Sequence, residues 1–137
     1  MTEYTSEIKT ISCCDECIFS TLSDLSNLER IKDRIPQDHL KNFSFTKDSC
    51  SFEVNPVGKI DFHIVSREPH KTIKFATTNS PFPLFLWIQL KQTGENVTKM
   101  KMTVRAELNP LFKTMIAKPI QEGLNKLADA IAAIPYE

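Results

Sequence analysis

The sequence predicts an α+β fold in which a seven-stranded, curved antiparallel sheet holds a long C-terminal helix. Apolar and polar residues alternate over six segments between Phe43 and Leu108, which is the pattern of half-buried strands. After them, apolar residues recur every three or four positions from Leu111 to Ile131, which is the pattern of an amphipathic helix. A sheet that curves around this helix is the simplest way to bury its apolar stripe.

The bulk properties predict one domain and exclude several classes of partner. A chain of 137 residues buries a core of its own, so residues 1–137 are expected to form one domain without a disulfide or metal staple. Seventeen basic and seventeen acidic residues cancel, which offers no attraction to nucleic acid or to an anionic membrane. The N-terminus resembles no signal peptide, and the longest apolar run, residues 83–88, is too short to span a bilayer. We expect a cytoplasmic protein with no nucleic-acid partner and no integral membrane association.

In the first third of the chain, the spacing of apolar residues changes once, from that of a strand to that of a helix. Residues 2–11 alternate and predict the first strand, whereas the apolar residues of 12–36 follow helical spacing. An interruption at Ser23 and Asp24 predicts two short helices, the second of which ends at Pro36. Ser12 is the expected N-cap of the first.

The remainder predicts an antiparallel meander followed by the long helix. Six strands are expected at residues 43–48, 49–54, 58–68, 71–78, 84–93 and 96–108. The helix starts at Asn109 and Pro110. Pro119 is expected to kink or loosen it, because proline removes a backbone donor and clashes with the preceding turn.

The order of the expected elements resembles that of a known superfamily. Through this order and the segments CIFSTLSDLSNLERI (17–31) and KPIQEGLNKLADAI (118–131), the sequence is similar to the SRPBCC superfamily. That superfamily has the START-like or helix-grip fold, shared by the birch-pollen allergen group, lipid-transfer START domains and polyketide cyclases or dehydrases. The likeness covers nearly the whole chain. It implies a pocket between the sheet and the C-terminal helix for sterols, lipids, polyketides or other apolar molecules, but it does not select a reaction.

Alternation along each strand predicts which side chains face the long helix. These positions are almost wholly apolar, and the flexible methionines among them can line an adaptable surface. Together with the pocket that the resemblance implies, they favour a ligand cavity of several hundred cubic ångströms. The alternative is that the same side chains fill one another's space as a packed core. The expected lining residues are Phe52, Ile60, Phe62, Ile64, Ile73, Phe75, Leu86, Ile88, Met100, Met102, Val104, Met115, Ile116 and Ile120.

The inward positions offer little for catalysis, which needs convergent acid–base groups or an activated nucleophile. His63 is the obvious candidate base, but it lies in phase with Asp61 on the convex side, where a solvated histidine is expected. We therefore predict no catalytic residue and no cofactor. The inward hydroxyl groups are those of Tyr4, Ser6, Thr10 and Thr77.

The convex side carries one apolar patch. Phe85 and Trp87 alternate outward, and Phe82 lies nearby in the sequence. If uncovered, these rings predict a contact with a partner or a homodimer. The alternatives are that a loop or the first strand covers them, or that a shift in strand register turns Trp87 inward and Ile88 outward.

Three of the four cysteines lie within residues 12–17, in the segment SCCDEC. Structural zinc needs four ligands, whereas Cys14 and Cys17 supply one pair, Cys13 is expected to point elsewhere, and Cys50 has no neighbouring ligand on its strand. A thioredoxin-like redox pair belongs to a different topology, although a helix start would lower the pKa of a thiol. We predict no metal site and interpret these cysteines as packing residues.

The leading functional hypothesis is a non-catalytic binding or carrier module for an apolar or amphipathic small molecule, lipid-like or polyketide-like. The alternatives are a polyketide cyclase or dehydrase-like enzyme, and an interaction module that uses the surface of Phe82, Phe85 and Trp87.

Overall fold

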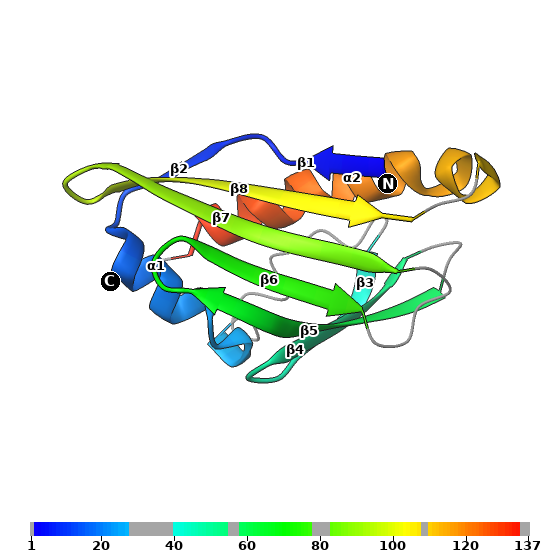
Figure 1. Cartoon of the computed structure of the whole chain (residues 1–137), viewed down its shortest axis with the longest axis horizontal. Helices are drawn as coiled ribbons and strands as arrows, with labels where there is room; N and C mark the ends of the chain where they lie inside the picture. The colour runs from blue at the N-terminus through cyan, green and yellow to red at the C-terminus, as the bar shows by residue number, and fades with distance from the viewer. Residues whose placement is uncertain (1, 28–39, 55–57, 78–82, 108–109, 135–137) are drawn as a thin grey trace.

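A single antiparallel sheet and two helices form the described part of the chain (Figure 1). The computed structural model describes residues 2–27, 40–54, 58–77, 83–107 and 110–134, with every side chain in these ranges except those of residues 40, 41, 54, 112, 116 and 119. The predicted α+β class is confirmed. Neither helix is both long and apolar enough to cross a bilayer.

The sheet follows the chain order, with the N-terminal segment added at its far edge. Its strand order is β1-β8-β7-β6-β5-β4-β3, and β2 also pairs with β8, so that β1 and β2 share one edge. The sheet therefore has the seven strand positions that the sequence predicts. The strands are β1 (Thr2–Thr5), β2 (Lys9–Ile11), β3 (Leu40–Phe45), β4 (Ser49–Val54), β5 (Gly58–Glu68), β6 (Thr72–Thr77), β7 (Leu84–Gly94) and β8 (Val97–Ala106).

The expected first strand is divided in two, which corrects the prediction of one strand over residues 2–11. Pairing with β8 shifts by one residue, from Thr5 opposite Thr103 to Lys9 opposite Met100. Such a bulge turns the following side chains to the other face of the sheet. Tyr4 and Ile11 consequently both pack against the core, although strict alternation would put them on opposite faces.

Ser6 helps to stabilise this bulge through its backbone and its side chain. The Ser6 backbone N–H donates to the Met102 carbonyl oxygen at 2.8 Å, while the Ser6 hydroxyl oxygen accepts from the Met102 N–H at 2.9 Å. Gln121 of the C-terminal helix donates to the Thr5 carbonyl oxygen, and Asn125 accepts from the Glu7 N–H. The helix thus satisfies backbone groups that the interrupted strand leaves unpaired.

Helix α1 (Asp15–Leu22) starts later than expected. Its N-cap is Cys14, which makes no side-chain capping bond, so the prediction of Ser12 as N-cap was wrong. The side chain of Gln92 on β7 instead accepts from the Asp15 N–H at 2.9 Å. A 3₁₀ turn follows at residues 25–27, and the rest of the predicted second helix lies outside the described residues.

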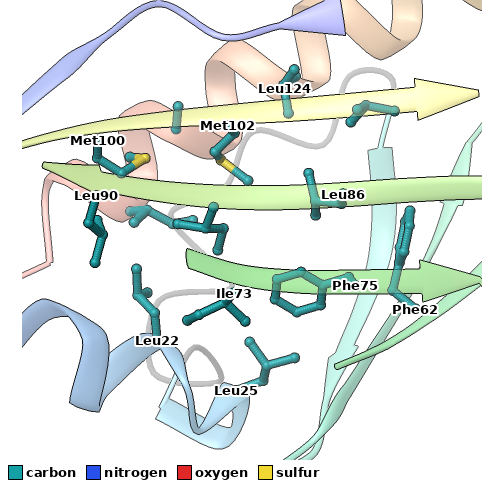
Figure 2. Packing of buried hydrophobic residues seen from close by; sticks show 14 of the residues in the cluster. Leu22, Leu25, Phe62, Ile73, Phe75, Leu86, Leu90, Met100, Met102 and Leu124 are labelled. Carbon is teal, nitrogen blue, oxygen red and sulfur yellow. The ribbon is translucent and has the colours of Figure 1, made fainter. Parts of the chain in front are cut away.

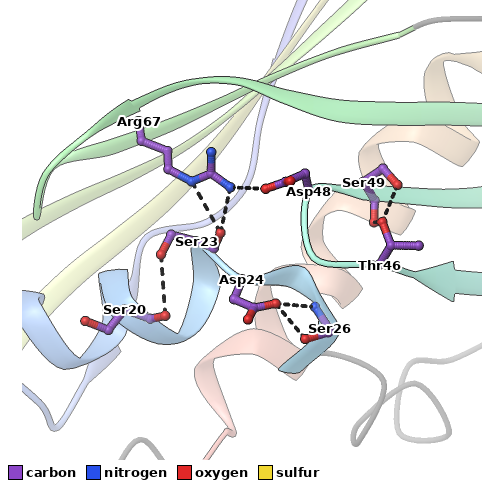
Figure 3. Close-up of polar contacts among 8 residues, drawn as sticks. All are labelled: Ser20, Ser23, Asp24, Ser26, Thr46, Asp48, Ser49 and Arg67. Carbon is purple, nitrogen blue, oxygen red and sulfur yellow. Dashed lines mark hydrogen bonds and ion pairs between the residues drawn. The ribbon is translucent and has the colours of Figure 1, made fainter.

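Polar contacts hold the end of α1 against the sheet (Figure 3). The Arg67 guanidinium on β5 donates to the Ser23 carbonyl oxygen at 2.9 Å and to Asp48 at 2.6 Å. Next to it, Asp24 accepts from the Ser26 hydroxyl, which holds the pKa of Asp24 below its ordinary value. These contacts place Leu25, which is buried in the core, under the sheet.

Helix α2 (Pro110–Ala132) packs against β1, β2 and β8 and continues without a break through Pro119. Leu124, Ala128 and Ile131 in its second half are buried, and Figure 2 shows Leu124 over the sheet. Its first turns lie past the end of β8 (Figure 1). Leu111 and Met115 there are 68% and 42% exposed.

Candidate functional site

An apolar cavity of about 80 Å³ lies between the concave face of the sheet and α2. Strands β3 to β8 form most of its wall, the 3₁₀ turn contributes one side chain, and the second half of α2 closes it. Leu25, Phe75, Leu86 and Leu124 are among the lining side chains that Figure 2 shows. The cavity therefore occupies the place that the sequence indicates for a ligand.

Nine of the fourteen expected lining residues are in this wall: Phe52, Ile60, Phe62, Phe75, Leu86, Ile88, Met102, Val104 and Ile120. Ile73 and Met100 are instead buried in the core beside the cavity, and Ile64 is half-buried against that core. Met115, in the first half of α2, is exposed. The Ile116 side chain lies outside what the structure describes.

The wall also contains nine residues that were not among those expected from the sequence: Leu25, Phe43, Phe45, Cys50, Leu84, Gly123, Leu124, Leu127 and Ile131. Two signals could have found most of them. Phe43 and Phe45 alternate on the first strand of the hairpin, and Leu124, Leu127 and Ile131 continue the apolar stripe of the helix.

The cavity is smaller than the several hundred cubic ångströms expected of a ligand site. The additional lining residues explain the difference, since Leu25, Leu124 and the two phenyl rings of β3 occupy space that the expectation left open. The interior is thus neither solidly packed nor large.

Aromatic rings cover one side of the cavity in a continuous row. Phe45 stacks on Phe43 with ring centroids 5.9 Å apart, Phe43 lies 5.5 Å from Phe52, and Phe52 lies 5.7 Å from Phe62. Separations of this size are typical of favourable offset aromatic pairs. The row presents carbon and ring surface toward the cavity and suits an apolar or aromatic guest.

Ionisable groups are almost absent from the described wall. Cys50 is the single ionisable side chain among the described lining residues, and burial raises the pKa of its thiol to about 12. It is therefore a neutral thiol at physiological pH. A charged ligand group would find no partner among these lining side chains.

The other polar residues considered from the sequence lie elsewhere. Thr10 is exposed and accepts from the Lys99 ammonium group at 2.6 Å. His63 is half-buried, on the β5 face opposite the lining residues Ile60 and Phe62. The His63 Nδ1 atom and the Tyr4 hydroxyl are buried without a hydrogen-bond partner in the described part of the chain. Burial raises the pKa of Tyr4. His39 lies outside the described residues.

Comparison with known proteins supports the fold. The sequence matches no protein-family model and no curated protein. The structure resembles a START superfamily protein from Mycobacterium smegmatis, with a TM-score of 0.69, 15% identity, and 95% of this chain and 94% of that chain covered. It also resembles norcoclaurine synthase from Thalictrum flavum, with a TM-score of 0.69, 14% identity, and coverage of 96% and 85%. This chain has the START-like helix-grip fold. The resemblance of the sequence to START-like proteins is thereby confirmed. At sequence identities of 14–15%, the structural similarity shows the fold alone.

The outer face of this helix-grip sheet places positive charge over its aromatic rings. Phe85 and Trp87 are half-buried, with ring centroids 6.2 Å apart. The Lys74 ammonium group lies 5.2 Å from the Phe85 centroid, and the Arg105 guanidinium lies 5.5 Å from that of Trp87. Both distances fit cation–π contacts. Phe82 lies outside the described residues, and association through this face stays a prediction.

Beside Trp87 the same face has a shallow depression of about 320 Å³. Its side chains largely pair with one another. Arg105 donates to Glu3 at 2.8 Å, and the Thr103 hydroxyl donates to Gln89 at 2.9 Å. These mutual bonds would have to be exchanged for ligand bonds, which makes the depression a weaker candidate than the interior cavity.

The cysteines at the start of α1 form a compact group. The sulfur atoms of Cys13, Cys14 and Cys17 all lie within 4.8 Å of one another. The expectation that Cys13 points elsewhere was wrong, because Ser12 and Cys13 form a bend rather than a strand, and adjacent side chains in a bend need not alternate. No disulfide joins these residues.

Hydrogen bonding within this group differentiates its thiols. A hydrogen bond from the backbone N–H of Cys17 holds the pKa of Cys14 below its ordinary value, and a hydrogen bond from the Cys17 thiol lowers it further. The pKa of Cys17 is raised to about 11, because its thiol donates to Cys14 and lies close to Cys13. The lowered pKa of Cys14 agrees with its position at the helix start, where backbone N–H groups stabilise a thiolate.

Proposed function

We propose that this chain binds a small apolar molecule, preferably one with an aromatic ring, in the cavity between the sheet and α2. The row of rings formed by Phe45, Phe43, Phe52 and Phe62 is the observation that carries the proposal. A planar guest can stack on such a row, and no described lining side chain carries a charge that its binding would desolvate.

A structural neighbour adds support for this ligand class. A structure of norcoclaurine synthase from Thalictrum flavum contains dopamine and hydroxybenzaldehyde, and this chain resembles it with a TM-score of 0.69 over 96% of its length. Small aromatic molecules are thus held by a protein of this fold. For the present chain, the proposal of an aromatic ligand rests on its own phenylalanine-lined cavity wall.

The size of the cavity limits the ligand or requires movement. A volume of about 80 Å³ is well below that of ordinary ligand sites. We propose that a guest separates α2 from the sheet and enlarges the cavity. The role is that of a carrier or binding module. The cyclase or dehydrase alternative needs convergent acid–base groups, and the described wall offers Cys50 as its one ionisable group.

A substitution that fills the cavity tests the proposal. Val104→Phe places a ring where a buried isopropyl group lines the cavity, whereas Val65→Phe makes the same change at a position of β5 that is 47% exposed. Hydroxybenzaldehyde and indole serve as aromatic probes and hexanol as an aliphatic one, in titrations followed by amide NMR shifts.

We expect the aromatic probes to shift resonances of the cavity wall in the unmodified protein and in Val65→Phe, and to lose at least tenfold in affinity for Val104→Phe. Circular dichroism and the urea midpoint establish that each variant is folded. Equal binding by the two variants would place the ligand elsewhere, and tighter binding of hexanol than of indole would reject the aromatic preference.

A further inference from the structure

The group of three cysteines at the junction of β2 and α1 has the composition and geometry of a site for a soft metal ion. Their three sulfur atoms lie within 4.8 Å of one another. Cys13 is buried, Cys14 is half-buried and Cys17 is exposed, so solvent reaches the group from the side of Cys17 while Cys13 is shielded. None of the three lines the apolar cavity, which makes this group independent of the proposed ligand site.

Neighbouring elements hold the backbone of this group in place. Thr98, fully buried on β8, donates its hydroxyl hydrogen to the Cys13 carbonyl oxygen at 2.8 Å. The Cys13 N–H donates to the Ile11 carbonyl oxygen at 2.9 Å, and Gln92 of β7 accepts from the Asp15 N–H at 2.9 Å. The sulfur atoms are therefore already assembled, and binding an ion requires little further ordering of the chain.

The ligand set selects the ion. Thiolates are soft ligands that favour Cu(I), zinc and iron–sulfur clusters over magnesium, calcium or manganese. A structural zinc site takes four protein ligands, whereas no fourth cysteine, histidine or carboxylate joins these three in the part of the chain that the structure describes. Three sulfur ligands without a fourth fit an ion that accepts trigonal coordination.

We propose that Cys13, Cys14 and Cys17 bind one Cu(I) ion through three sulfur atoms. Each coordinating thiol releases its proton to solvent as its sulfur–copper bond forms, and no electron is transferred. Small movements of the Cys14 and Cys17 side chains suffice to bring the sulfur atoms to bonding distance, because these two side chains are less buried than that of Cys13.

The test uses the full, reduced chain under anaerobic conditions. Cu(I), supplied as its acetonitrile complex, is titrated in competition with bicinchoninate, and the thiolate-to-copper charge-transfer absorption is recorded. One equivalent should bind. Cys17→Ser should lower the affinity at least tenfold, whereas Cys50→Ser, which removes the remaining thiol, should leave it unchanged. X-ray absorption should find three sulfur neighbours around copper.

Several results would overturn the proposal. These are an unmodified protein that binds Cu(I) no more tightly than the triple serine variant, an equal loss in Cys50→Ser and Cys17→Ser, or two sulfur neighbours in place of three. A parallel competition titration measures zinc binding. Stoichiometric zinc binding without Cu(I) binding would reject the copper assignment. Because Cys17 is exposed, its serine variant should fold, and its urea midpoint checks this.

Discussion

Leu124 provides a direct test of how α2 closes the cavity. The side chain is 5% exposed and lines the cavity, so Leu124→Ala should remove buried surface and enlarge the void. Losing three buried carbon groups costs about 0.8 kcal/mol each, or about 2.4 kcal/mol. The enlarged void adds about 24 cal/mol for each cubic ångström that neighbouring atoms do not refill.

A further empty volume equal to the present cavity of about 80 Å³ would add about 1.9 kcal/mol. We therefore expect Leu124→Ala to lower the free energy of unfolding by about 4 kcal/mol, within the known range for buried leucines. Urea unfolding followed by circular dichroism measures this loss as a shift in midpoint at constant slope.

The matched control lies on the same helix. Leu111 is 68% exposed, and Leu111→Ala should change the free energy of unfolding by less than about 0.5 kcal/mol. Equal losses for the two variants, or a loss below about 1 kcal/mol for Leu124→Ala, would refute the packing of α2 described above.

Three further predictions concern the side chains of Ser6, Thr98 and Cys50. Ser6→Ala removes the acceptor for the buried Met102 N–H and should cost about 1–3 kcal/mol by urea unfolding, whereas Ser6→Thr, which keeps a hydroxyl, should cost clearly less. Thr98→Val removes the hydrogen bond to the Cys13 carbonyl oxygen and should weaken Cu(I) binding about tenfold, and unchanged affinity would mean that this bond does not position the thiols. The Cys50 thiol, with a pKa of about 12 in place of the ordinary 9.0, should resist alkylation at neutral pH until urea unfolds the chain, as followed by mass spectrometry. The unfolded thiol ionises first, so stability should fall as the pH rises from about 9 to about 12, and Cys50→Ala should remove this part of the pH dependence.

Strands β4 to β8 could be predicted from the sequence because their alternation is nearly uninterrupted, whereas β3 covers Leu40–Phe45 in place of the expected 43–48. β5 has the predicted bounds, and β7 and β8 differ by one or two residues at their ends. The first strand could not be predicted in full. Its bulge depends on bonds from Ser6 to Met102 and from Gln121 and Asn125 of a distant helix, which leave no local pattern.

The cavity wall was predicted in part for a similar reason. Alternation specifies the face on which a side chain lies, but it does not specify which turns of α2 cover that face. Met115 was therefore placed inside, although the second half of the helix, with Leu124, Leu127 and Ile131, forms the wall. The convergence of Cys13 with its neighbours was missed because the local bend before α1, rather than residue spacing, decides where its thiol points.

The pairing of the first and last strands bears on the order in which the molecule can fold. Among the described strands, β3 to β7 pair with their neighbours in the chain, whereas Thr2 of β1 pairs with Ala106 of β8, so the N-terminal edge must wait until β8 has been synthesised. Such distant contacts are slow to form because a long loop must close first. Helix α2 follows β8 and can cover the concave face only afterwards. A hydrophobic molecule present during synthesis would therefore meet an open, phenylalanine-rich sheet and be enclosed as folding finished, without having to pass through a completed wall.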